Sequence, residues 1–526
     1  DVKAVFNGTT IDLQRAEMRF GAGKFNAKGS YDRLSEAFNL DIDGKTVPLP
    51  LVLALLPKND AIPQISGMVD FNAKATGILE RASTYNINFS GVAPNVQVGE
   101  NSLGQVAFKG NTANQMLTAD LRATLDGNPQ VINAAVNFGD DNLPFTIATD
   151  FNQSPLAPFL AFVPQLKGLS ITGTGTGRIE FGGNLYALDS KGERVFSTET
   201  LSGKAEFEQL ALQIQDTPLS AAEPVVIRFN TREIVFERAR FAGSGSNMTI
   251  AGTKALTDDG INDLSINGRV NLRLLNLISK DTFFAGLADT SIRLSGRNAT
   301  VSGTANIVNG SIATFLGSDR FTIERLKARI IFTSNQVEVE EASGYLGGGK
   351  FIASGGGILG GDAGPSTGAL GGLALQAFRF SLDGSNVTVP LPKDFITTGD
   401  ARLEISGNRL NPSSPLRMRI GGRVLARRSV YSKDIDLANL VGGRRDPVLT
   451  GGGSSFSAPQ FDNLVIEGRD ALIVKNNIAD LTASVSLVLS GDADNPRIYG
   501  RITANSGTIF FRKDRYDVQR GVLEFP

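Results

Sequence analysis

Residues 67–77 decide the fold class, because their sequence, GMVDFNAKATG, alternates between apolar and polar side chains. Val69 and Phe71 fall on one face of an extended chain, while Asp70 and Asn72 fall on the other. Glycines bound the segment at both ends, as is typical of a short strand between turns. The segment therefore predicts a strand in an antiparallel sheet that has one apolar and one solvated face.

The same alternation recurs along the chain, between glycines that punctuate it. Ile292 and Leu294 share one face of the segment 286–296, and Leu403 and Ile405 share one face of the segment that follows Gly399. Helical periodicity is scarce, so we predict an all-β fold with a few short helices. The candidate helices are Leu51–Leu56, Leu156–Phe162 and Leu272–Ser279.

A local pattern of Gly residues between apolar residues recurs at residues 20–25, 241–245 and 346–351, with a fainter copy at 125–128. The intervals are 105, 116 and 105 residues, which indicates an array of similar units. We predict four repeats followed by a distinct C-terminal β region that is truncated in this chain. The predicted boundaries are 1–105, 106–220, 221–325, 326–422 and 423–526. Two stretches resemble linkers, 355–372 and 442–459.

The composition restricts the chemistry that the chain can perform. Cys, His and Trp are absent, which removes thiolate nucleophiles, imidazole acid–base catalysis and zinc sites built from His or Cys. The 52 basic and 53 acidic residues are spread along the chain and give no reason to expect nucleic acid as a partner. Ser/Lys and carboxylate chemistry and oxygen-ligand metal sites remain possible, but no such site stands out in the sequence. We expect no enzyme activity, no cofactor and no metal. Neither a signal peptide nor a membrane-spanning segment is visible, and we expect a processed chain or a fragment.

Three motifs suggest binding chemistry but have simpler interpretations. Residues 344–350 match the spacing of a phosphate-binding loop, yet Phe351 replaces the metal-binding Ser or Thr and an alternating segment follows in place of a helix. The acidic residues Glu338, Glu340 and Glu341 are interpreted as one solvated strand face. Paired basic residues could meet lipid phosphates but are interpreted as solvated turns. They are Arg427–Arg428, Arg444–Arg445 and Arg512–Lys513.

The C-terminal segment carries a family resemblance. It contains Leu489–Gly491, Pro496–Ile502, Gly507–Ile509 and Arg520–Phe525, and this order resembles the C-terminal region of the TamB family. An earlier stretch, Pro415–Val424, repeats part of this order of residues, and the upstream units are similar to AsmA-like proteins.

The resemblance implies an elongated, repetitive antiparallel β-sheet, curled into an apolar-lined groove of the β-taco type. It also implies a location in the periplasm of a bacterium with two membranes. The expected partners are phospholipid, the inner membrane through an N-terminal anchor outside this chain, and an outer-membrane TamA-like barrel protein through the C-terminal region. The residues predicted to line the groove are Val69, Phe71, Ile179, Phe181, Ile292, Leu294, Leu403 and Ile405.

Three functions remain open from the sequence. The first is a conduit that moves phospholipid between the inner and outer membranes. The second is an assembly factor or chaperone for outer-membrane or secreted proteins, which would pair exposed strand edges with client strands. The third is an adhesin or carbohydrate-processing β-solenoid, which the absence of Trp disfavours. The 32 Phe residues fit either a groove lining or the sealed core of a solenoid.

Overall fold

A computed structural model provides the coordinates. The residues that it describes are 1–54, 64–99, 101–125, 128–160, 170–188, 192–197, 199–257, 259–277, 282–297, 299–316, 319–361, 373–389, 395–409, 414, 416–434, 459–492, 495–511 and 514–526. Strands dominate this part of the chain, and most of them pair with antiparallel neighbours. The predicted all-β class with few short helices is confirmed.

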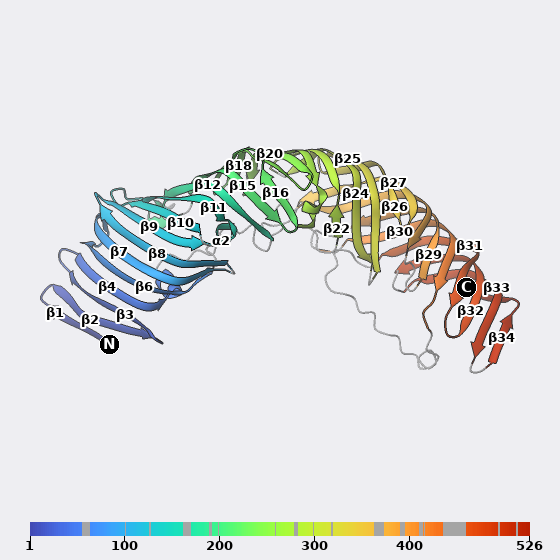
Figure 1. The fold of residues 1–526 in the computed structure, drawn as a ribbon, viewed down its shortest axis with the longest axis horizontal. Coiled ribbons are helices and arrows are strands. Elements are labelled where there is room, and N and C mark those ends of the chain that lie inside the picture. Colours follow the sequence, from blue (N-terminus) through green and yellow to red (C-terminus); the bar gives the residue numbers. More distant parts are fainter. Residues whose placement is uncertain are drawn as a thin grey trace. The chain divides into compact units, whose positions relative to one another are not determined.

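The chain divides into two units, Asp1–Leu264 and Ser265–Pro526, and the boundary falls within strand β21 (Asn262–Asn271). Within each unit, strands that follow one another along the chain mostly lie side by side (Figure 1). Such local pairing is typical of repeat proteins, whose elements contact their neighbours in sequence.

The first unit contains two short helices, α1 (Leu49–Leu53) and α2 (Ala157–Leu160). Its strands before β21 are β1 (Val2–Asn7), β2 (Thr10–Phe20), β3 (Gly23–Asp32), β4 (Ala37–Pro48), β5 (Ile65–Ser66), β6 (Met68–Ile78), β7 (Arg81–Val98), β8 (Asn101–Ala113), β9 (Met116–Leu125), β10 (Asn128–Asn137), β11 (Pro144–Pro155), β12 (Ile171–Asn184), β13 (Tyr186–Leu188), β14 (Arg194–Phe196), β15 (Ser202–Ile214), β16 (Thr217–Ala221), β17 (Val225–Asn230), β18 (Glu233–Arg238), β19 (Arg240–Gly243) and β20 (Ser246–Ala255). Strands β13 and β14 form a separate hairpin.

The second unit contains a 3₁₀ helix, η2 (Leu272–Leu277). Its strands after β21 are β22 (Thr282–Ala285), β23 (Leu287–Gly296), β24 (Thr300–Leu316), β25 (Asp319–Thr333), β26 (Gln336–Leu346), β27 (Gly349–Gly361), β28 (Leu373–Val389), β29 (Phe395–Asn408), β30 (Arg417–Tyr431), β31 (Gln460–Lys475), β32 (Ala479–Asp492), β33 (Arg497–Phe511), β34 (Asp514–Val518) and β35 (Gly521–Phe525). Strands β30 and β31 pair in parallel, unlike their neighbours.

The three short helices begin close to where the sequence predicts them. Leu49, Leu156 and Leu272 each donate a backbone hydrogen bond of 2.9 Å to the carbonyl of a glycine that lies just before a strand or near its start. The three acceptor glycines are Gly67, Gly173 and Gly286. The same local arrangement thus recurs at three of the predicted repeats, while the repeat boundaries themselves stay a prediction. Residues 55–56, 161–162 and 278–279 of the predicted helices lie outside the described residues.

The recurring glycine pattern forms hairpin turns. Gly21 (φ 62°) lies between β2 and β3, Gly245 (φ 83°) between β19 and β20, and Gly347 (φ 55°) between β26 and β27. Positive φ values at such positions favour glycine and match the twist of the flanking strands. The segment 344–350 is therefore a hairpin between two strands, as the alternation after it predicts.

Many of the long strands are bent by a β-bulge. In β4 the register against β6 shifts between Gly44 and Val47, and in β28 the register against β29 shifts between Gly384 and Val387. A bulge adds a residue to one strand only and increases its local curvature. We call the parts of a strand on either side of its bulge the arms; in β4 and β28 the arm after the bulge is short, Val47–Pro48 and Val387–Val389.

Candidate functional site

The eight predicted lining residues lie in pairs on four strands. Val69 and Phe71 lie in β6, and Ile179 and Phe181 in β12. Ile292 and Leu294 lie in β23, and Leu403 and Ile405 in β29. Each pair is buried or half-buried, while the residue between its two members and the residue before it are exposed. The exposed neighbours are Asp70, Asn72, Arg178, Glu180, Ser291, Arg293, Arg402 and Glu404. We call the face that bears the eight residues the apolar face, and the opposite face the polar face.

The apolar face is most deeply buried where the strands bend. In the first unit, Val47, Val69, Ala93 and Val96 form one cluster, with exposures of 5% or less. Phe71 packs against this cluster and is half-buried. Burial therefore decreases from the bulges towards the arms of the strands.

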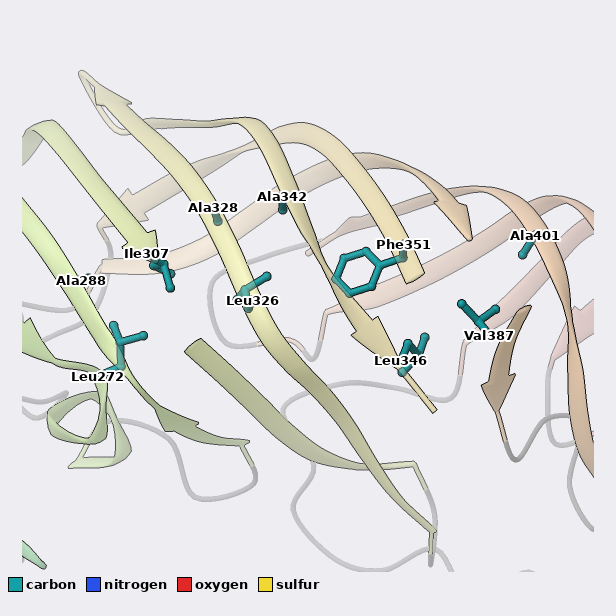
Figure 2. Packing of buried hydrophobic residues seen from close by; sticks show 10 residues of the cluster. All are labelled: Leu272, Ala288, Ile307, Leu326, Ala328, Ala342, Leu346, Phe351, Val387 and Ala401. Atoms are coloured by element: carbon teal, nitrogen blue, oxygen red, sulfur yellow. The ribbon is translucent and has the colours of Figure 1, made fainter. Parts of the chain in front are cut away.

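In the second unit, one continuous cluster runs from η2 through the neighbouring strands β23 to β29. Figure 2 shows its ten buried residues, which lie on η2 and on the strands from β23 to β29. Leu403 packs against this cluster and also against a second one that contains Phe461, Leu464 and Leu489. The cluster is thus a strip that extends across consecutive strands, as a lining does. That all eight predicted residues line one continuous groove stays a prediction.

Lys254 places a cation on the apolar face of the first unit. The register aligns Phe229 with Ile234 and Ile234 with Lys254, and directly opposite residues share a face. Lys254 Nζ donates hydrogen bonds to the carbonyl of Ala255 (2.7 Å) and to Asn262 Oδ1 (3.1 Å). Burial lowers the pKa of Lys254, because a less hydrated ammonium is less stable.

The polar face carries ion pairs between neighbouring strands. They include Lys28–Asp41, Lys109–Asp120, Arg178–Asp150, Arg269–Asp289, Arg329–Glu340, Arg379–Glu404 and Arg427–Asp400. Exposed pairs of this kind stabilise a protein little, about 0–1 kcal/mol each. Glu338, Glu340 and Glu341 are all exposed, as expected of a solvated strand face. Arg444–Arg445 and Arg512–Lys513 lie outside the described residues.

Two hollows, of about 970 Å³ and 690 Å³, are lined in large part by polar-face residues such as Glu338, Glu340, Arg178 and Glu206. Neither encloses the predicted lining as a sealed cavity would. Within the part of the chain that the structure describes, no group of three or more Asp and Glu residues could hold a metal ion.

At three bulges, a side-chain oxygen of the neighbouring strand accepts a hydrogen bond from a backbone N–H group, and the sequence analysis missed this interaction. The backbone N–H of Thr46 donates to Asp70 Oδ1 (2.6 Å), that of Gln153 to Thr176 Oγ1 (3.1 Å) and that of Asn386 to Asp400 Oδ1 (2.8 Å). All three donors have positive φ, between 50° and 55°. The sequence signal was weak, because a bulge is recognised only once the partner strand and its register are known.

Asp400 is held ionised by its neighbours. Its hydrogen bond from the Arg427 guanidinium (2.7 Å) is the main cause of a lowered pKa, and the Asn386 N–H adds to it. Arg427, which the sequence offered as a candidate for lipid phosphate, therefore already has an anionic partner.

These features define a class of protein: a repetitive all-β chain whose sheet offers a broad apolar face. Residues 352–526 match the family model of the TamB C-terminal domain, and this match supports the assignment of the chain to the TamB family. The matched region begins within β27, before the C-terminal segment that carried the resemblance. No curated protein and no solved structure matches the chain.

The family has an assembly or transport role in the cell envelope and is a non-enzymatic component of it. Proteins of this family belong to the cell envelope. None of the helices in the described ranges is both long and apolar enough to span a bilayer.

Proposed function

We propose that the apolar face binds the acyl chains of phospholipids, and that the protein conducts lipid between the inner and outer membranes across the periplasm. The observation that carries this proposal is the half-burial of the apolar face in the arms of the strands. A sealed core would bury alternate residues almost completely along the whole strand. In β6, only Val69 at the bend is buried to that degree, while Phe71, Ala73 and Ala75 remain half-buried.

The physical driving force is removal of hydrocarbon and of the apolar face from water. Each buried CH₂ contributes about 0.8 kcal/mol, so two acyl chains could contribute on the order of 10 kcal/mol before the cost of association. Headgroups would remain in water and lose little hydration. The polar face carries exposed ion pairs, so it can remain in contact with water while the apolar face binds lipid.

The experiment is native mass spectrometry of the protein purified from bacterial membranes in mild detergent, with lipid extraction and an empty-vector control. We expect several phospholipids per chain. Phe71→Asp, Phe181→Asp and Leu294→Asp together should remove most of them, because each places a charge on the apolar face. Asn72→Asp and Ser291→Asp are the matched control, because they place charges on the polar face of two of the same strands.

A folded protein that carries no lipid would contradict the proposal. That result would favour the assembly role in envelope proteins, acting with a TamA-like barrel partner. Crosslinks between strand edges and client proteins would then be the measurement to make.

A further inference from the structure

Phenylalanine and glycine alternate across neighbouring strands on the apolar face. In the first unit, the register aligns Phe25 with Gly44, Gly44 with Phe71, Phe71 with Gly91 and Gly91 with Phe108. This row crosses five strands, β3, β4, β6, β7 and β8, and each aromatic ring has a glycine directly beside it. The alternation runs across the sheet and not along the chain.

The second unit contains the same arrangement in separate rows. Gly344 is aligned with Phe351 and Phe351 with Gly384. Phe378 lies between Gly357 and Gly407 in the next strands. The arrangement is therefore a property of both halves of the chain.

At two positions, Gly44 and Gly407, the aromatic ring lies over the glycine. A Cβ built on Gly44 would stand 2.4 Å from Cε1 of Phe71, and all three of its nearest atoms belong to that ring. A Cβ on Gly407 would stand 2.4 Å from Cε1 of Phe378, again with only ring atoms nearest. Both glycines are buried, while Phe71 and Phe378 are half-buried, so the rings cover the glycines.

Backbone conformation does not explain these glycines. Neither Gly44 nor Gly407 has a positive φ, so a larger residue could adopt the same backbone. Glycine in a strand interior weakens the strand through its greater freedom in the unfolded chain. The space beside the aromatic ring is the remaining physical reason for glycine at these positions.

We propose that these glycines are positioning residues that let the aromatic rings lie flat along the sheet. The rings then leave room above the apolar face for unbranched acyl chains. This inference rests on the proposed function. A Cβ at Gly44 would force the Phe71 ring to turn away from the sheet, into the space that a hydrocarbon chain would occupy. The displaced ring would then obstruct the binding of an acyl chain to the apolar face.

The test uses the absence of Trp from the chain, which makes a single introduced Trp a local fluorescent reporter. Phe25→Trp places the reporter beside Phe71, since the Phe25 and Phe71 ring centroids are 6.5 Å apart. The probe is a phosphatidylcholine vesicle whose acyl chains carry bromine, which quenches Trp fluorescence on contact. Phe380→Trp is the equivalent reporter beside Phe378, at 5.9 Å between centroids.

We expect bromolipid to quench both reporters. Gly44→Ala should weaken the lipid affinity at the first reporter roughly tenfold, the loss of about two buried CH₂ groups. Gly407→Ala should do the same at the second. Gly521→Ala is the control, because its Cβ would come no closer than 3.5 Å to another residue and its φ is not positive.

The double variant Gly44→Ala/Phe71→Leu distinguishes a loss of space for the acyl chain from a loss of protein stability. It removes the ring that Ala would displace, so lipid affinity should return to within about threefold of the parent, although the unfolding temperature stays lowered. Unchanged affinity in Gly44→Ala and Gly407→Ala would overturn the inference, as would a double variant that binds more weakly than Gly44→Ala. If the parent reporters are not quenched at all, the proposed function fails, and the inference fails with it.

Discussion

At the scale of single residues, the bend in the strands depends on polar groups that meet backbone N–H groups at bulges. Asp400 receives the Asn386 N–H and the Arg427 guanidinium, and its side chain is 30% exposed. A carboxylate with such donors is stabilised in its ionised form. The interaction joins β28, β29 and β30 at one point of the sheet.

We expect Asp400→Asn to lower the free energy of unfolding by about 1 kcal/mol at pH 7, because the amide keeps an acceptor for Asn386 but loses the charge. The pKa of Asp400 is lowered in the folded state, so its stabilising effect is present above the unfolded pKa of about 3.9 and is lost as pH falls through the folded value. Urea unfolding at pH 7 and pH 3 should therefore show a deficit that shrinks in acid. A deficit of equal size at both values would contradict this account. Asp383→Asn is the control, because Asp383 forms a more exposed pair with Arg402.

Gly303 and Gly296 both have a positive φ, unlike Gly44, but only Gly303 also lies close to another backbone atom. Gly303 has φ 125°, and a Cβ there would stand 1.9 Å from the Ser291 carbonyl oxygen. Gly296 has φ 75° but no atom within 4 Å of its Cβ position. We expect Gly296→Ala to lower the free energy of unfolding by about 1 kcal/mol from backbone strain alone, and Gly303→Ala by at least about 2 kcal/mol more. Thermal unfolding of the two variants checks the difference, and equal effects would show that close approach is unimportant.

At the scale of strands, side chains of the apolar face are deeply buried near the bulges and half-buried along the rest of the strand. Phe351 in β27 is 5% exposed and belongs to the central cluster of the second unit. Phe380 in the adjacent strand β28 is half-buried and lies outside the buried set of that cluster. The stabilising core is therefore narrow, and the rest of the apolar face contributes less to the fold.

We expect Phe351→Ala to lower the free energy of unfolding by about 3–4 kcal/mol and Phe380→Ala by about 1–2 kcal/mol, because only the first creates a cavity in a packed region. Denaturant titration of both variants measures the ratio. Equal losses would mean that the arms are as tightly packed as the bend, which would also weaken the proposal of an open lipid-binding face.

At the scale of the whole molecule, the surface area distinguishes an open sheet from a compact one. The accessible surface is 31141 Å², for a mass of 55.8 kDa. A compact protein of that mass exposes about 18,000 Å², and two compact halves would expose about 22,000 Å². The chain therefore buries less surface on folding than a compact protein of its mass.

Because less surface is buried on folding, the denaturant m-value should be roughly four-fifths of that of a compact protein of equal length. Urea or guanidinium titration followed by circular dichroism measures it, and the heat capacity change on unfolding should be reduced in parallel. Each unit needs its own fit if the transitions separate, since the two-state treatment then fails. An m-value at or above the compact expectation would indicate that the apolar face is covered in solution.

The sequence by itself determined the all-β class and the two unlike faces of the sheet. These follow from patterns of period two and from local glycine turns, which are properties of neighbouring residues and need no knowledge of partners. For the same reason, residues 344–350 could be assigned to a turn between strands and the starts of three short helices could be placed. Which apolar residues are deeply buried could not be deduced from alternation, since Val69 and Phe71 look alike in the sequence.

Only the tertiary structure decided the bends, the bulge contacts of Asp70 and Asp400, and the rows in which glycine lies beside phenylalanine. Gly44 and Phe71 are far apart along the chain, and nothing local to either residue specifies that they share a row. Their pairing depends on the register between β4 and β6, and a shift of one residue would bring a different set of side chains together. Register arises from many weak contacts summed over whole strands, so the shape of the apolar face emerges only once all the strands are paired.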